Sequence, residues 1–154
     1  MRGTALILGF CFLLRFAAAS STVELRNQFE EACTSKHKAG TLYAALASIH
    51  TPNYLVMGYT GAVESIMARY SSNPIHKLRY CRNGLNRLNK AINEAPSSLE
   101  LRYLRLMIEH HIPSFLNMSE HMQADKKLIL LLLPASEDVD LNKRIIGFLL
   151  EKNI

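Results

Sequence analysis

The stretch NPIHKLRYCRNGLNRLNKAINEAPSSLELRYLRLMIEHHIP, residues 73–113, predicts two helices with one break between them. Asn73 followed by Pro74 indicates the start of the first helix, because asparagine is a favoured N-cap and proline fits the first helical position. Apolar residues then recur every three or four positions, which is typical of a helix with one buried face. The predicted buried stripe consists of Leu78, Cys81, Leu85, Leu88 and Ile92.

A second helix is predicted over residues 98–112, directly after Pro96. The Ser-x-x-Glu spacing of Ser97 and Glu100 predicts a capping box at its start. Because the break at Pro96 is short, we expect the two helices to pack as an antiparallel pair. The predicted buried face of the second helix consists of Leu101, Leu104 and Ile108, flanked by Tyr103 and Met107.

The opposite face of this second helix is charged, with Arg102, Arg105 and Glu109 in one stripe. We favour a structural interpretation, in which the stripe forms a partly buried network with Asp125 on a neighbouring helix and fixes the register of the two helices. In the alternative interpretation, Arg102 and Arg105 bind an anionic ligand or a carboxylate of a partner protein.

Outside this stretch, the spacing of apolar residues predicts helices at 22–37, after Gly40, at 54–70, from about 119 to 133, and up to the C-terminus. Three helix boundaries look alike and fall at Pro52, Pro96 and Pro134. The sequence before Pro96 resembles the end of a tetratricopeptide repeat, in which alanine and an aliphatic residue precede the proline. We therefore predict an all-α protein, a short tetratricopeptide-like array of about six to seven helices in antiparallel pairs.

Two further segments have a distinct composition. Gly58, Gly61, Ala62 and Ser65 form a strip of small residues on one helix, which predicts the close approach of a neighbouring helix. A small ligand lying against this strip is the alternative. The apolar run 128–133 is too short to span a membrane and predicts a fully buried helix end.

The N-terminal residues 1–19 have the features of a signal peptide. Arg2 precedes a ten-residue apolar run, and small residues at 17–19 fit a cleavage site. We predict that this segment is removed and that residues 20–154 form a single α-helical domain of an exported protein, periplasmic or secreted. Loss of Arg2 and Arg15 lowers the formal net charge from +5 to +3. We expect no nucleic-acid partner and, after cleavage, no transmembrane segment.

Two cysteines remain after this cleavage, Cys33 and Cys81. Export permits a disulfide between them. Both also fall on apolar helical stripes, so two buried free thiols are the alternative.

The histidine cluster Glu109-His110-His111 lacks the His-Glu-x-x-His spacing of zinc proteases. Neighbouring helical residues point about 100° apart, so His110 and His111 are poorly placed to share one ion. A metal site would need Glu120 and His121 from across the following turn. The sequence also has no Gly-rich phosphate loop, Gly-x-Ser-x-Gly elbow or Cys-x-x-Cys pair. We predict no catalytic residues, no metal, no cofactor and no enzymatic activity.

The most basic part of the chain is residues 75–105, which hold seven lysines and arginines and two acidic residues. An anionic membrane surface or polyanion would suit such a region, and a solvated helix face explains it equally well. The cations are Lys77, Arg79, Arg82, Arg87, Lys90, Arg102 and Arg105.

Residues 67–131 resemble a family of small exported bacterial α-helical proteins of unknown function. The resemblance covers less than half of the chain and implies export and a helical fold, but no activity. The matching residues are Asn73, Pro74, Ala91, Ile92, Pro96, Glu100, Arg102, Tyr103, Leu104, Arg105, Pro113, Phe115, Leu116, Asp125 and Lys126.

The sequence thus predicts an exported, non-enzymatic scaffold that offers a groove between helix pairs to a protein or peptide. The alternative is a peripheral binder of an anionic membrane surface or ligand through the basic helix 75–93. A third and less favoured hypothesis is an enzyme that acts on a small ligand or depends on a metal.

Overall fold

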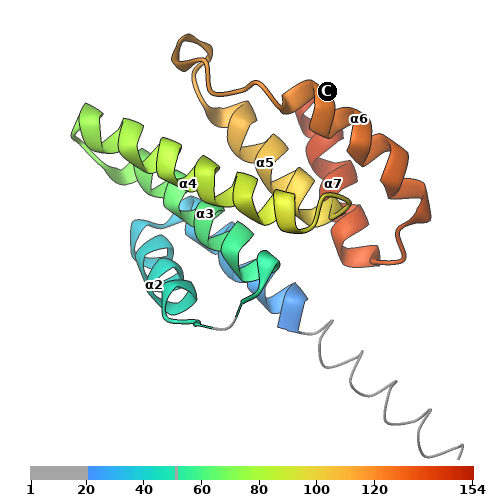
Figure 1. The fold of residues 1–154 in the computed structure, drawn as a ribbon, viewed down its shortest axis with the longest axis horizontal. Coiled ribbons are helices and arrows are strands. Elements are labelled where there is room, and N and C mark those ends of the chain that lie inside the picture. The colour runs from blue at the N-terminus through green and yellow to red at the C-terminus, as the bar shows by residue number, and fades with distance from the viewer. Residues whose placement is uncertain (1–20, 51) are drawn as a thin grey trace, which may run out of the picture.

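The structure, a computed structural model, describes residues 21–50 and 52–154. The predicted signal peptide lies outside the described residues. The described part of the chain contains seven α-helices and no strand, and neighbouring helices pack as antiparallel pairs (Figure 1). The predicted all-α class is therefore confirmed.

The helices have the following bounds. The first described helix spans residues 21–34. It is followed by α2 (Lys36–Ala47), α3 (Tyr54–Tyr70), α4 (Pro74–Glu94), α5 (Leu99–His111), α6 (Met122–Leu132) and α7 (Val139–Lys152). Short 3-10 turns, η1 (Ser114–Leu116) and η2 (Leu133–Ala135), follow α5 and α6.

Side-chain caps explain several helix starts. The Asn73 side chain accepts hydrogen bonds from the first turn of α4, and Pro74 occupies its first position, as predicted. Asp138 caps α7 in the same way, by accepting from the Leu141 amide at 3.0 Å. The capping box at Glu100 was a wrong prediction. Ser98 is the N-cap of α5, and the carboxylate of Glu100 is bound by side chains of other helices.

Three predicted boundaries also differ from the structure. The first described helix ends at residue 34, three residues before the predicted end. α2 begins before Gly40 because the side chain of Ser35 accepts from the Lys38 amide and caps the helix there. α6 begins at Met122, three residues after the predicted start. The hydroxyl of Ser119 donates to the carbonyl of Glu109 in α5, so it holds the preceding loop and does not cap α6.

The closest helix pair is α3 with α4, and glycines make the contact. A Cβ atom placed on Gly61 would lie 2.5 Å from the carbonyl oxygen of Gly84. A Cβ atom on Gly84 would collide with Gly61 and Ser65, including the Ser65 backbone nitrogen at 2.6 Å. The strip of small residues therefore serves the close approach of a neighbouring helix, because a side chain at either glycine would push the two backbones apart.

The helix α5 joins two hydrophobic cores. Leu101, Leu104 and Ile108 belong to a large core with α2, α3, α4 and the helix 21–34. Leu106 belongs to a smaller core with α6 and α7. Because seven of its thirteen residues are buried, α5 is the central helix of the fold.

The apolar run 128–133 is only partly buried, contrary to the prediction. Ile129 is fully buried in the smaller core, whereas Leu130 and Leu131 are 52% and 71% exposed. α6 therefore packs through one narrow face.

Candidate functional site

A buried arginine that the sequence analysis did not single out, Arg26, joins three other helices to its own. Its guanidinium binds Glu100 of α5 through Nε–Oε1 at 2.8 Å and Nη2–Oε2 at 2.9 Å. It also donates to Asp138 at 2.6 and 3.1 Å and to Asp140 at 3.0 Å, both at the start of α7. The hydroxyl of Tyr59 in α3 donates to Glu100 at 2.6 Å. We call these five residues the Arg26 cluster.

The charges in the Arg26 cluster stabilise one another. Burial alone would lower the pKa of Arg26, but hydrogen bonds with Glu100 and Asp138 and the charge of Glu100 raise it above its ordinary value. Burial would raise the pKa of Asp138, yet hydrogen bonds from Arg26 and a backbone amide lower it. The pKa of Asp140 is lowered mainly by its hydrogen bond from Arg144. The cluster thus fixes α7 against the rest of the fold through ionised groups.

A second cluster contains the predicted arginines. Asp125 has no exposed surface and accepts from Arg105 at 2.6 and 2.7 Å and from Arg102 at 2.9 Å. Arg105 also donates to Asn89 of α4 at 2.8 Å, and Arg102 donates to the carbonyl of Pro96. The structure therefore brings Arg102, Arg105 and Asp125 together, and this Asp125 cluster joins α4, α5 and α6.

Glu109, the fourth predicted residue of that network, lies elsewhere. It is buried at the end of α5 and accepts from the His121 backbone amide at 3.0 Å. Its other oxygen lies 2.8 Å from His121 Nδ1. Together with the Ser119 hydroxyl, which donates to the Glu109 carbonyl at 3.0 Å, these bonds tie the loop 112–121 to α5.

The remaining histidines of this region form no ligand set. His110 packs against Phe148 with ring centroids 5.7 Å apart. Burial, together with the charges of His111 and Lys152, lowers the pKa of His110. Among residues 21–50 and 52–154, no group of three histidine, cysteine or acidic side chains is arranged to hold a metal ion.

The polar groups of these clusters form their hydrogen bonds within the protein. In the described part of the chain, only one buried side-chain polar atom, Oδ1 of Asn142, lacks a hydrogen-bond partner. The buried side chains of Arg26 and Arg105 direct their donors at carboxylates and an amide of the same chain. What these clusters can do is hold helices in register, since partners inside the fold occupy the groups that would bind a ligand.

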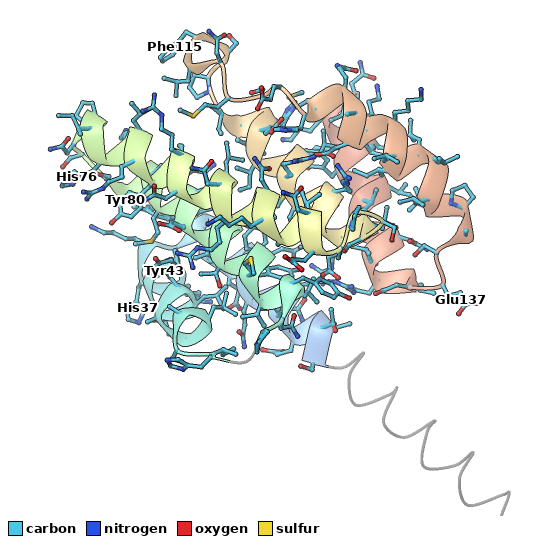
Figure 2. All side chains as sticks on the ribbon, viewed as in Figure 1. His37, Tyr43, His76, Tyr80, Phe115 and Glu137 are labelled. Carbon is cyan, nitrogen blue, oxygen red and sulfur yellow. The ribbon has the colours of Figure 1, made fainter. Side chains whose placement is uncertain are left out.

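A different kind of feature begins on the first half of α4. The stripe predicted to be buried is buried at Leu85, Leu88 and Ile92 but only half-buried at Leu78 and Cys81. The loop after α5 carries Phe115, which is 80% exposed, and Leu116, which is half-buried. Figure 2 shows Phe115 at the tip of that loop and Tyr80 near the beginning of α4.

One exposed and several half-buried apolar side chains line one part of a groove of about 1400 Å³. In this part its walls include Leu78 and Cys81 of α4 and Phe115 and Leu116 of the loop. The groove is also lined by the helix 21–34, α3, α5 and α7, including the buried side chains of Leu104 and Ile108. A concave, largely apolar surface of this size is the candidate functional site.

The charged residues along the groove are mostly cationic. Six of them are cations and three are acidic, namely Glu30, Asp140 and Glu151. All three acidic residues are in ion pairs with arginine or lysine. Within the described chain, the cations of the groove that have no carboxylate partner are Arg69, Lys77 and Lys143.

Both cysteines of the predicted disulfide, Cys33 and Cys81, line this groove as free thiols. Burial raises the pKa of Cys33 to about 11 and also raises that of Cys81. Neither thiol is therefore activated at neutral pH. The disulfide is not formed in the structure, and its formation after export stays a prediction.

The basic region is divided by the fold into two parts with different roles. Arg102 and Arg105 are occupied by Asp125. The five cations of α4 are exposed, and of these only Arg87 forms an ion pair with a described residue, Glu64. The exposed cations of α4 are Lys77, Arg79, Arg82, Arg87 and Lys90.

Comparison with protein family models, curated proteins and solved structures gives no match for the chain. None of the helices in the described residues is both long and apolar enough to cross a membrane. The resemblance to small exported bacterial proteins therefore stays a prediction.

Proposed function

We propose that the protein is an exported, non-enzymatic helical scaffold that binds a protein partner in the groove. The observation that carries this proposal is the apolar surface around Leu78, Cys81 and Phe115, which the helices of the fold leave partly open to solvent. Phe115 is 80% exposed, although burial of a phenylalanine side chain is worth about 1.5–3 kcal/mol. An exposed apolar surface in a concave site is typical of a region that a partner covers.

The arrangement of helices supports this function. Neighbouring helices pack as antiparallel pairs, as in the short tetratricopeptide-like array that the helix boundaries at Pro52, Pro96 and Pro134 predict. Arrays of helix pairs bury their apolar faces on one another and leave a shallow concave surface between pairs, where they bind peptides. The non-enzymatic part of the proposal is supported by the Arg26 and Asp125 clusters. Within each cluster the charged groups are paired with one another and so are not directed at a substrate.

Site-specific photo-crosslinking tests the proposal. A photoreactive residue in place of Leu78 should capture one defined partner when the protein is expressed in its own exported compartment. The matched control is Leu131, an exposed leucine of α6 outside the groove. The captured protein, once purified, should bind the wild-type chain, and Leu78→Asp should lower its affinity at least tenfold. Equal capture from both positions, or unchanged affinity of Leu78→Asp, would contradict the proposal.

The exposed cations of α4 support a second function, peripheral binding to an anionic membrane surface. α4 carries five cations and one acidic residue, Glu94, and Ile75 at its start is 75% exposed. A juxtaposed anionic surface attracts each nearby cation by about 1 kcal/mol at low salt. Sedimentation with phosphatidylglycerol vesicles tests this function. Binding at low salt that is lost in Arg79→Glu/Arg82→Glu would support it, and no binding at low salt would exclude it.

A further inference from the structure

We infer that the partner segment that fits this groove is an acidic amphipathic α-helix of about three turns. This inference rests on the proposed function and adds the chemistry of the partner to it. It is carried by the size of the groove, its helical walls and the charges along it.

The groove has enough room for a short helix. A helix about 10 Å across and three turns, or about 16 Å, long fills roughly 1300 Å³. The groove holds about 1400 Å³, which exceeds the usual range of about 300–1000 Å³ for small-molecule sites. Its walls are the second half of α3, the first half of α4, the end of α5, the helix 21–34 and α7, so an added helix would pack against helices on several sides.

The apolar side chains of the groove determine which face of the partner helix enters. Leu78 and Cys81 are three residues apart on α4 and project from one face of that helix. Phe115 and Leu116 lie on the loop, which is held to α5 by Glu109. A partner with apolar residues at i, i+3, i+4 and i+7 places one apolar stripe between these two walls.

The charges of the groove determine the polar face of the partner. Arg69, Lys77 and Lys143 line the groove and have no carboxylate partner among the described residues, whereas each acidic residue of the groove is already paired. Acidic residues that flank the apolar stripe of the partner would meet these cations. The chain's own segment 1–20 fits poorly by this criterion, because it contains Arg2 and Arg15 and no acidic residue.

The experiment uses three fluorescent helical peptides and the purified protein. The first has an apolar stripe flanked by glutamates, the second has the same stripe flanked by lysines, and the third is a scrambled form of the first without a stripe. Fluorescence anisotropy should show that the first peptide binds at least tenfold more tightly than either of the others. Its affinity should fall as salt is added, because the charges of the groove lie near the surface.

Matched variants locate the binding. Leu78→Asp and the double variant Lys77→Glu/Lys143→Glu should each lower the affinity for the acidic peptide at least tenfold. The controls Leu131→Asp and Lys36→Glu/Lys127→Glu change exposed residues outside the groove and should leave its affinity within twofold. Circular dichroism and thermal unfolding establish that each variant is folded.

Several outcomes would overturn the inference. Equal binding of the acidic and basic peptides excludes the charge preference, and equal binding of the scrambled peptide excludes the apolar stripe. Binding that survives Leu78→Asp places the peptide outside the groove. If photo-crosslinking at Leu78 captures a partner but the acidic peptide does not bind, this inference fails while the proposed function stands. If phosphatidylglycerol vesicles displace the acidic peptide and the captured partner does not, the groove binds lipid and the inference is wrong.

Discussion

The two halves of α4 carry the same kind of stripe but have different surroundings. Leu85 and Leu88 in the second half are buried against α3 and α5, and Gly84 brings the backbone of α3 into contact. Leu78 and Cys81 in the first half belong to the same stripe and line an open groove. Helical periodicity thus shows which face of a helix is apolar, but not whether the chain itself covers that face.

The largest effect is expected where the second half of α4 meets the Asp125 cluster. Asp125→Ala leaves Arg105 buried with its charge unpaired, because Asn89 of α4 is then its remaining side-chain partner. Breaking one side of a buried ion pair costs about 3–5 kcal/mol of unfolding free energy. Urea unfolding followed by circular dichroism measures this loss. The control, Glu137→Ala on an exposed loop, should change stability by less than about 0.5 kcal/mol.

Leucine truncations compare the two halves directly. Leu88→Ala removes a fully buried side chain and should lower the unfolding free energy by about 3 kcal/mol. Leu78→Ala should cost less than about 1 kcal/mol, because its side chain is already half in water. The same urea titrations give both values. Equal losses would mean that the first half of α4 is packed as tightly as the second.

The glycine contact of the second half gives a somewhat smaller effect. Gly84→Ala places a methyl group against the backbone of Gly61 and Ser65, so α3 and α4 must separate. Overpacking of this kind costs about 1–3 kcal/mol. Gly40→Ala is the control, since a Cβ atom at this position meets nothing within 4 Å. This substitution should stabilise α2 by about 0.5–1 kcal/mol. A neutral Gly84→Ala in thermal unfolding would contradict the close approach of the two helices.

The smallest effect concerns α7, which lines the groove together with the first half of α4. The pKa values of Asp138 and Asp140 are lowered in the folded protein, so their ionisation stabilises the fold above their ordinary pKa of about 3.9. This contribution is lost as the pH falls from there through the folded pKa values. Between pH 5 and pH 3, the unfolding free energy of wild type should therefore fall more steeply than that of Asp138→Asn. Parallel curves would show that Asp138 adds no pH-dependent stability.

Much of the fold could be predicted from local sequence signals. Asn73-Pro74 and the break at Pro96 gave the limits of α4, and the small residues of α3 indicated the close helix pair, because caps and glycines act within a few residues. The start of α2 was predicted wrongly, since Gly40 was taken as a break although Ser35 provides the cap. Glycine tolerates helical geometry when nothing else interrupts the helix.

The buried clusters were harder to predict. Asp125 was named as a partner of the arginines, but Glu109 was assigned to the same network and in the structure is bonded to His121. Arg26 was missed altogether. Its one sequence signal is that it lies three residues before Phe29, on the apolar face of its helix. A charge on such a face needs a buried partner, but the sequence does not say which of thirteen acidic residues supplies it.

The sequence by itself determined that the chain is helical, where α4 and α5 begin and which faces of its helices are apolar. These properties depend on residues a few positions apart. Only the tertiary structure decided that Arg26 meets Glu100 and Asp138, which lie 74 and 112 residues away. It also decided that Leu85 is fully covered and Leu78 only partly. The physical reason is that burial and ion pairing depend on which helices meet in space, and helices of similar pattern can meet in many arrangements.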